Sequence, residues 1–99
     1  MEHQQRLSWL TEAAEQLGIA VRCEHLGGEG GGLCALKSQR ILFVDMDADP
    51  RTRYEKTLMA LAELPGLQDR YIPPIIAEDM DRLVKGSGDE SSGWGNRSG

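Results

Sequence analysis

The chain has 99 residues, of which 39% are hydrophobic and 27% charged, and its formal net charge is -5. This length accommodates one hydrophobic core, so a single small globular domain is predicted. The acidic balance disfavours direct binding to nucleic acid, because acidic side chains repel the phosphate backbone. No run of 18 apolar residues occurs, so we expect no membrane-spanning segment.

The first ten residues are polar and lack the apolar core of a secretory signal, which favours a cytoplasmic protein. Cys23 and Cys34 are the only two cysteines. In a cytoplasmic chain such cysteines are typically reduced, small core residues. They flank a glycine-rich segment, so they could also lie on neighbouring strands and form a disulfide under oxidation.

Residues 2–17 have the pattern of an amphipathic helix. Leu7, Leu10, Ala14 and Leu17 recur at helical spacing and form one apolar stripe. Gly18 follows where a carboxyl-terminal cap is expected.

Three strands are predicted next, over residues 19–26, 33–37 and 41–45, with a turn at residues 37–40. The third has a continuous apolar run, which indicates burial on both faces. The links between the strands are short. They favour a three-stranded antiparallel meander with the helices packed on one face.

Asp49 and Pro50 suit the N-cap and first position of a second helix, which is predicted to run to Leu64. A short last helix is predicted after residues 73–74, with Ile76, Met80 and Leu83 on one side. Residues 86–99 are rich in Gly and Ser and are predicted to be a disordered tail that contains Trp94. The fold class is therefore α+β, with one domain over residues 1–85 and a tail over residues 86–99.

The glycine-rich segment is the first candidate binding site, with Gly28, Glu29, Gly30 and Gly31 as its residues. It lacks the Gly-Lys-Ser/Thr ending of a phosphate-binding loop, and a strand follows it where a helix would be needed. We interpret the glycines mainly as a tight or bulged connection. If the loop binds a ligand, close approach of its backbone suits a peptide as well as an anion.

The acidic cluster Asp45, Asp47 and Asp49 is the second candidate site. Four apolar residues followed by Asp-x-Asp resemble the first motif of haloacid-dehalogenase-like phosphatases. That resemblance implies Asp45 as nucleophile, Asp47 as acid/base and a bridging Mg²⁺. The short links argue against the parallel sheet that this fold needs. The structural interpretation is that Asp45 ends a strand, Asp47 lies in a turn and Asp49 caps a helix.

A zinc site would have to combine Cys23, His25 and Cys34, which is one ligand short of a structural site. No set of residues for nucleophilic catalysis is complete, and only two histidines are present. We therefore predict no bound metal and no cofactor.

The order of a lead helix, a strand, Gly-Gly-Leu-Cys, a hairpin strand and a capped helix resembles the front half of ImmA/IrrE-like zincin domains, over roughly residues 5–67. In that family the helix carries His-Glu-x-x-His. Only Glu63 matches, since Ala62 and Gly66 occupy the histidine positions. The resemblance implies a degenerate binding fold without zinc hydrolysis. The chain also resembles small bacterial proteins with this order of strand, hairpin and helix, and that resemblance implies no particular activity.

These observations favour a non-enzymatic interaction or regulatory module. Its expected contact surface is the glycine loop with an adjacent strand edge, or the acidic residues, and its partner is another protein or a second copy. The alternative is a Mg²⁺-dependent phosphoryl-transfer or hydrolytic enzyme that uses Asp45 and Asp47.

Overall fold

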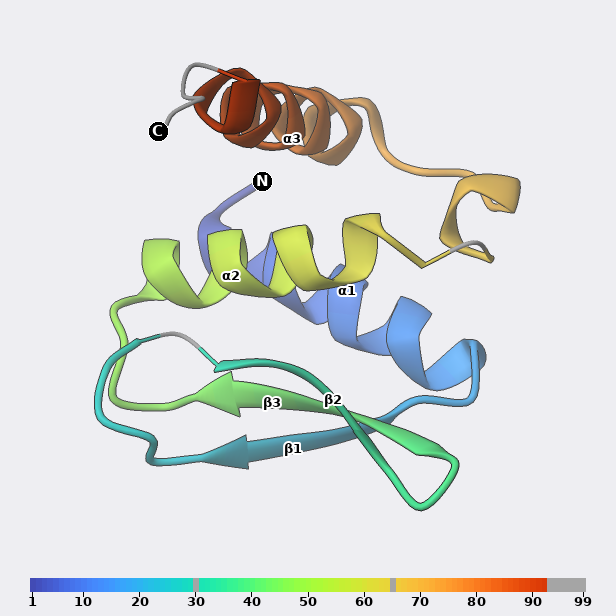
Figure 1. The fold of residues 1–99 in the computed structure, drawn as a ribbon, viewed down its shortest axis with the longest axis vertical. Coiled ribbons are helices and arrows are strands. Elements are labelled where there is room, and N and C mark those ends of the chain that lie inside the picture. Colours follow the sequence, from blue (N-terminus) through green and yellow to red (C-terminus); the bar gives the residue numbers. More distant parts are fainter. Residues whose placement is uncertain (30, 65, 93–99) are drawn as a thin grey trace.

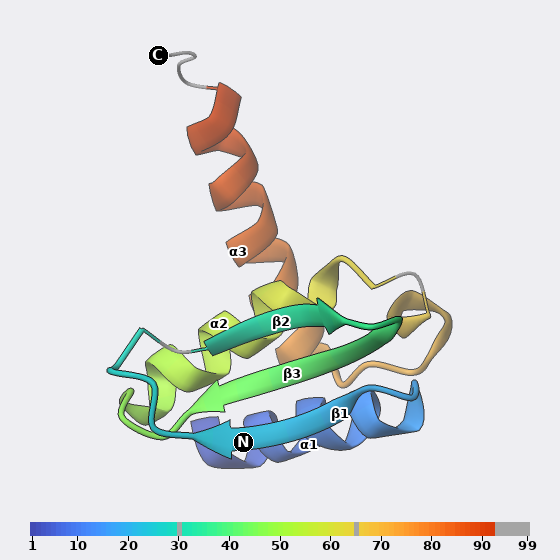
Figure 2. The same ribbon diagram turned by 60° about the horizontal axis from the view of Figure 1, so that its bottom comes forward.

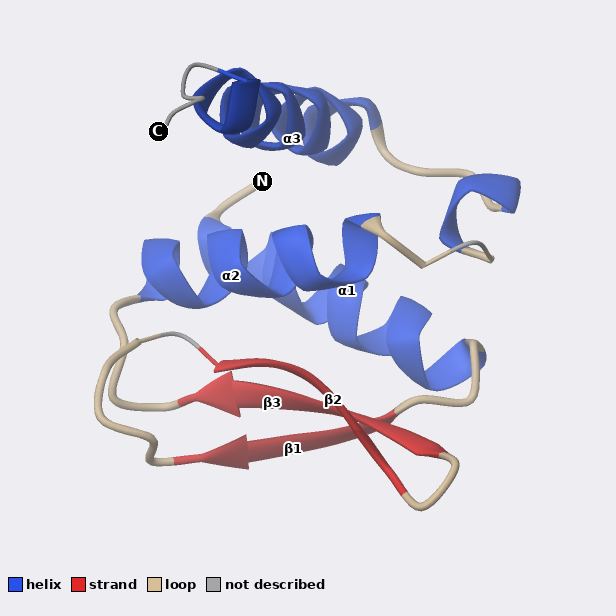
Figure 3. Cartoon of the chain, in the orientation of Figure 1, coloured by secondary structure: helices blue, strands red, loops and turns tan. Residues whose placement is uncertain are grey.

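A computed structural model describes the backbone of residues 1–29, 31–64 and 66–92. In chain order the elements are α1 (His3–Gln16), β1 (Ala20–Glu24), β2 (Gly31–Leu36), β3 (Gln39–Asp45), α2 (Pro50–Ala62), the 3-10 helix η1 (Leu67–Asp69) and α3 (Pro74–Ser92). The α+β class predicted from the sequence is confirmed (Figures 1 and 3).

The sheet has the order β1-β3-β2, with β1 parallel and β2 antiparallel to β3. The predicted antiparallel meander is therefore wrong, because β1 pairs with β3 and not with β2. A parallel connection needs about a dozen residues, and the chain supplies them by using β2 and its flanking turns, residues 25–38, as the crossover. Strand β3, which contains the continuous apolar run of residues 41–44, takes the central position. Short links between consecutive strands therefore do not exclude parallel pairing of β1 with β3.

A local signal sets the carboxyl-terminal end of α1, as predicted. Gly18 has a φ of +85°, its N–H donates to Glu15 O, and the N–H of Ile19 donates to Ala14 O, each at 3.0 Å. This is a Schellman cap, in which a left-handed glycine lets the chain satisfy the last free carbonyls of the helix. The chain then turns directly into β1.

Strands β2 and β3 form a two-residue hairpin. Its turn residues Lys37 and Ser38 have φ values of 50° and 70°, and Leu36 pairs with Gln39. Two positive φ values are typical of the type I′ turn, whose twist matches that of the flanking strands. The turn predicted over residues 37–40 is thus confirmed at its first two residues.

The helices lie on one side of the sheet, as predicted, and no helix of the described residues covers the opposite face (Figures 1 and 3). The core lies between the two layers. Its fully buried side chains include Leu10 from α1, Leu42 and Val44 from β3, and Leu58 and Leu61 from α2.

Helix α3 packs on α2 and then projects beyond the body of the protein (Figure 2). Ile76 is fully buried, Met80 is 9% exposed and Leu83 is partly buried, so the predicted apolar side is confirmed. The helix is longer than predicted, because it continues to Ser92 and includes residues 86–92 that we assigned to the tail. The rest of that tail, with Trp94, lies outside the described residues. Within the described part of the chain, no helix is long and apolar enough to cross a membrane.

Candidate functional site

The glycine loop and the acidic cluster lie against each other. The carboxylate of Asp45 is fully buried at the end of β3. Its Oδ1 accepts the backbone N–H groups of Leu26 and Asp47, each at 2.9 Å, and its Oδ2 accepts that of Gly28 at 2.6 Å. A buried charge is tolerated when several hydrogen bonds compensate it. Asp45 thus holds the loop between β1 and β2 against the end of β3.

Asp47 fixes the same loop from the solvent side. Its Oδ2 accepts the N–H of Gly27 at 2.9 Å, and its Oδ1 lies 2.8 Å from Nδ1 of His25. The hydrogen bond with His25, followed by that from Gly27, lowers the pKa of Asp47. Two carboxylates therefore bind one short loop, which explains how the chain passes from β1 to the far side of β3.

Asp49 does not contact this loop in the hydrogen bonds described here and instead caps the start of α2. It accepts Oγ1–H of Thr52 at 2.6 Å and the N–H of Thr52 at 3.3 Å, and these two bonds lower its pKa. The predicted structural roles of the three aspartates at a strand end, in a turn and at a helix cap are confirmed. Of the loop residues that we predicted for binding, Glu29 is exposed and Gly30 lies outside the described residues.

This arrangement limits the chemistry available to the cluster. The N–H groups of Leu26, Gly27 and Gly28 already donate to carboxylates, so an anionic ligand would have to displace those carboxylates. In the described part of the chain, no group of three or more His, Cys, Asp or Glu side chains is placed to hold a metal ion. The observed hydrogen bonds make Asp45 and Asp47 a structural clamp on the loop between β1 and β2.

The two cysteines are free, but both are exposed, so the prediction that they are core residues is wrong. They lie on β1 and β2, which are separated by β3, so the alternative that they lie on neighbouring strands is wrong. Cys23 is in register with Val44 and Cys34 with Ile41, so their side chains are on opposite faces of the sheet. Two strand spacings are about 9–10 Å, beyond the reach of a disulfide. An intramolecular disulfide between them is excluded in this fold.

Gly31 is required where the glycine loop enters β2. Its φ is +93°, and a Cβ at this position would lie 2.1 Å from the carbonyl oxygen of Phe43. No other residue type fits so close to a neighbouring backbone. Gly31 is thus a packing requirement of the β2–β3 pair, which gives this predicted binding residue a structural reason.

The face of the sheet opposite the helices carries an apolar hollow of about 260 Å³. It is lined by Leu26, Gly31, Gly32, Leu33, Cys34 and Phe43. Phe43 is only partly buried, although the apolar run of β3 predicted burial on both faces. Leu26, which lines the hollow, is 43% exposed, and Leu36, four residues beyond Gly32 on the same face of β2, is 54% exposed. Apolar side chains thus gather on the uncovered face around Gly32.

Strand β2 also forms one edge of the sheet. In a two-residue hairpin the residues that flank the turn exchange hydrogen bonds, and hydrogen-bonded residues then alternate along the strand. Leu36 and Cys34 therefore bond to β3, and the N–H and C=O groups of Leu33 and Ala35 point outward. The sequence Gly-Gly-Leu-Cys-Ala-Leu of β2 contains no charge or proline that would block pairing along this edge.

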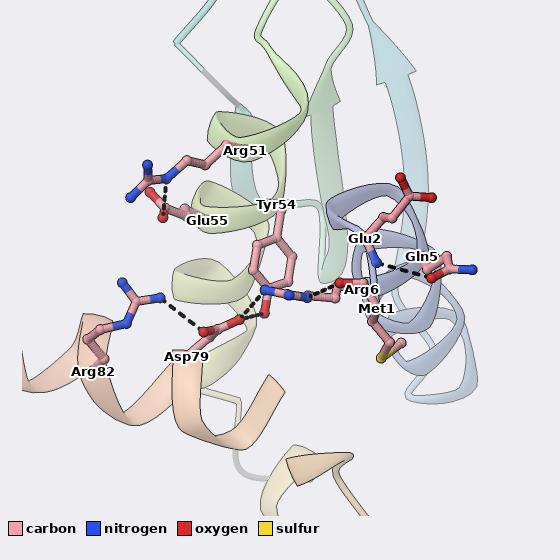
Figure 4. Close-up of polar contacts among 9 residues, drawn as sticks. All are labelled: Met1, Glu2, Gln5, Arg6, Arg51, Tyr54, Glu55, Asp79 and Arg82. Carbon is pink, nitrogen blue, oxygen red and sulfur yellow. Dashed lines mark hydrogen bonds and ion pairs between the residues drawn. The ribbon is translucent and has the colours of Figure 1, made fainter. Parts of the chain in front are cut away.

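A buried polar network, which sequence analysis missed, joins the three helices (Figure 4). Asp79 of α3 is 7% exposed. Its Oδ2 accepts the hydroxyl of Tyr54 at 2.6 Å and Nη1–H of Arg6 at 2.9 Å, and its Oδ1 accepts Nη2–H of Arg82 at 3.0 Å. The Arg6 guanidinium also lies over the Tyr54 ring, 5.6 Å from its centre.

The pKa values of Tyr54 and Asp79 are shifted in opposite directions. Burial, followed by the bond to Asp79, raises the pKa of Tyr54. Burial would also raise the pKa of Asp79, but hydrogen bonds from Tyr54 and Arg82 and the charge of Arg6 lower it overall. One sequence signal was available, since Asp79 falls between Ile76 and Met80 on the apolar side of α3. An acid in that position indicates a buried partner.

Searches against protein-family models, curated proteins and solved structures found no match to this chain.

Proposed function

We propose that this chain is a non-enzymatic interaction module that binds an extended strand of a protein partner along the edge of β2. The observation that carries the proposal is an uncharged edge strand beside an uncovered apolar face. The outward groups of Leu33 and Ala35 supply backbone hydrogen bonds, and the hollow around Gly32 receives a side chain of the bound strand. Main-chain bonds and alternate side-chain pockets are the elements of strand addition.

The opposite edge of the sheet is less suited to this role. On β1, Arg22 and Glu24 form an ion pair with a distance of 2.8 Å between Nη2 and Oε2, and their side chains are 60% and 38% exposed. Charged side chains on an edge strand discourage pairing with other strands. The difference between the two edges favours β2 as the contact surface.

The acidic cluster supports the module by holding the loop that leads into β2. Asp45 and Asp47 direct their oxygens to the loop backbone, so the Mg²⁺-dependent reaction considered as the alternative gains no support from this geometry. The earlier expectation of a contact surface at the glycine loop and strand edge is kept, with the edge as the binding element and the loop as its support.

The test compares three versions of the full chain on beads. Ala35→Pro removes an outward N–H and leaves the β2–β3 bonds in place, whereas Ala35→Ser keeps that N–H. Each is exposed to cell extract that also contains a tagged soluble copy of the chain. Proteins retained by the wild type and Ala35→Ser but lost with Ala35→Pro support the proposal. Equal retention by all three versions, or no retained protein, contradicts it.

A further inference from the structure

We infer that the strand bound by β2 is the β2 strand of a second copy, antiparallel to the first, with the twofold axis at Cys34. This inference rests on the proposed function and identifies its partner. The two sheets then form one continuous sheet of six strands, because each copy contributes three. A twofold interface requires that one surface complement itself, and three features of β2 meet this requirement.

The first feature is the position of the outward backbone groups. Leu33 and Ala35 lie one residue on either side of Cys34, so an axis at Cys34 places Leu33 of each copy opposite Ala35 of the other. Each of these two pairs exchanges two backbone hydrogen bonds. An axis at Leu33 would instead pair Ala35 with Gly31, whose φ of +93° departs from strand geometry. The register at Cys34 therefore uses both regular outward residues of each copy.

The second feature is a projection that matches a hollow. In this register Leu36 of one copy lies opposite Gly32 of the other, on the same uncovered face. Leu36 is 54% exposed, and Gly32 provides no side chain in the hollow of about 260 Å³. Leu36 of each copy thus fills the hollow of the other and covers Phe43, which lines that hollow. Burial of this apolar surface favours association.

The third feature is the absence of charge repulsion along the strand. All six residues of β2 are uncharged. The flanking Lys37 of one copy falls opposite Gly31 of the other in this register, so the two lysines lie at opposite ends of the paired strands. The β2 edges of two copies can therefore pair, although each chain has a net charge of -5.

The first experiment measures the oligomeric state of the full chain by sedimentation equilibrium. We expect a dimer for the wild type, and a dissociation constant at least about tenfold higher for Leu36→Glu, because a carboxylate would enter an apolar hollow. Val84→Glu is the matched control, since Val84 is 47% exposed on α3, away from the sheet. It should dimerise like the wild type. Circular dichroism and thermal melts check that both variants fold.

The second experiment tests the position of the axis. Opposed residues in a non-hydrogen-bonded pair have Cα atoms about 4.5 Å apart, within disulfide range. We expect diamide to link Cys34 of two Cys23→Ser chains, as the thiols give two electrons and two protons to the oxidant. The rate should fall at least about tenfold when Leu36→Glu is added. In Cys34→Ser chains, only Cys23 can form the disulfide between two chains. Its rate of linking measures random collision, and we expect it to be slower than the rate through Cys34.

The outcomes separate the inference from the proposed function. A monomeric wild type, a dimer that Leu36→Glu leaves intact, or equal linking through Cys23 and Cys34 would overturn the inference. If the chain is monomeric but Ala35→Pro abolishes capture of a different protein, strand binding by β2 stands and only the identity of the partner is wrong. If Ala35→Pro changes neither capture nor dimerisation, both proposals are wrong.

Discussion

Replacement of Asp45 by Asn tests whether the acidic cluster is a structural clamp. The side chain is fully buried, and its two oxygens accept N–H groups of Leu26, Asp47 and Gly28. Asparagine keeps one acceptor oxygen and presents an NH₂ group in place of the other. If the amide oxygen accepts the N–H groups of Leu26 and Asp47, the NH₂ group faces the N–H of Gly28. The hydrogen bond to Gly28 is then lost, and two donors lie against each other.

The magnitude follows from these contacts. A hydrogen bond to a charged group contributes about 1.5–3 kcal/mol, and an unsatisfied buried donor costs about 1–3 kcal/mol. We therefore expect Asp45→Asn to lower the free energy of unfolding by about 3 kcal/mol. For a domain of this size, that change lowers the melting temperature by roughly 12–24 °C.

Urea unfolding followed by far-ultraviolet circular dichroism measures this change, with and without Mg²⁺. Both conditions should give the same loss, because the wild-type carboxylate binds backbone groups and not a metal ion. Asp49→Ala is the control for loss of a neighbouring carboxylate, and its smaller effect should be confined to the start of α2. The reasoning is refuted if Asp45→Asn is as stable as the wild type, or if Mg²⁺ stabilises the wild type and this variant loses the response.

Three further predictions concern packing and pH. Thr57→Val should raise the free energy of unfolding by about 1 kcal/mol in urea titrations, because Oγ1 of Thr57 is buried without a hydrogen-bond partner within the described residues; a loss of stability would contradict this. Gly31→Ala should destabilise the fold more than Gly18→Ala in thermal melts, since both have positive φ but only the Cβ at residue 31 meets backbone; equal losses would contradict this. The pKa of Asp79 is lowered in the folded state, so its contribution to stability is present above the unfolded pKa of about 3.9 and is lost as the pH falls through the folded pKa. Asp79→Asn should be less stable at neutral pH and show a shallower loss in acid, and Tyr54→Phe should fall between; an unchanged acid slope would contradict the assigned contacts.

Local features of the sequence determined most of the secondary structure. Gly18 ends α1, Asp49 and Pro50 begin α2, and the turn after β2 lies at residues 37–38, all as predicted. Each of these signals depends on interactions within a few residues, such as a cap or a positive φ, so the sequence alone is sufficient. The roles of Asp45 and Asp47 at the end of a strand and in a turn followed from the same kind of signal.

The tertiary structure decided the order of the strands and the partners of the buried charges. Chain proximity favoured pairing of β1 with β2, but the apolar run of β3 is best buried at the centre, and the loop held by Asp45 carries the chain past it. Asp79 meets Arg6, which is 73 residues away, only because α1 and α3 both approach α2. Long-range contacts of this kind depend on how whole elements pack. No short-range pattern specifies them, and for that reason the sequence predicted the elements but not their arrangement.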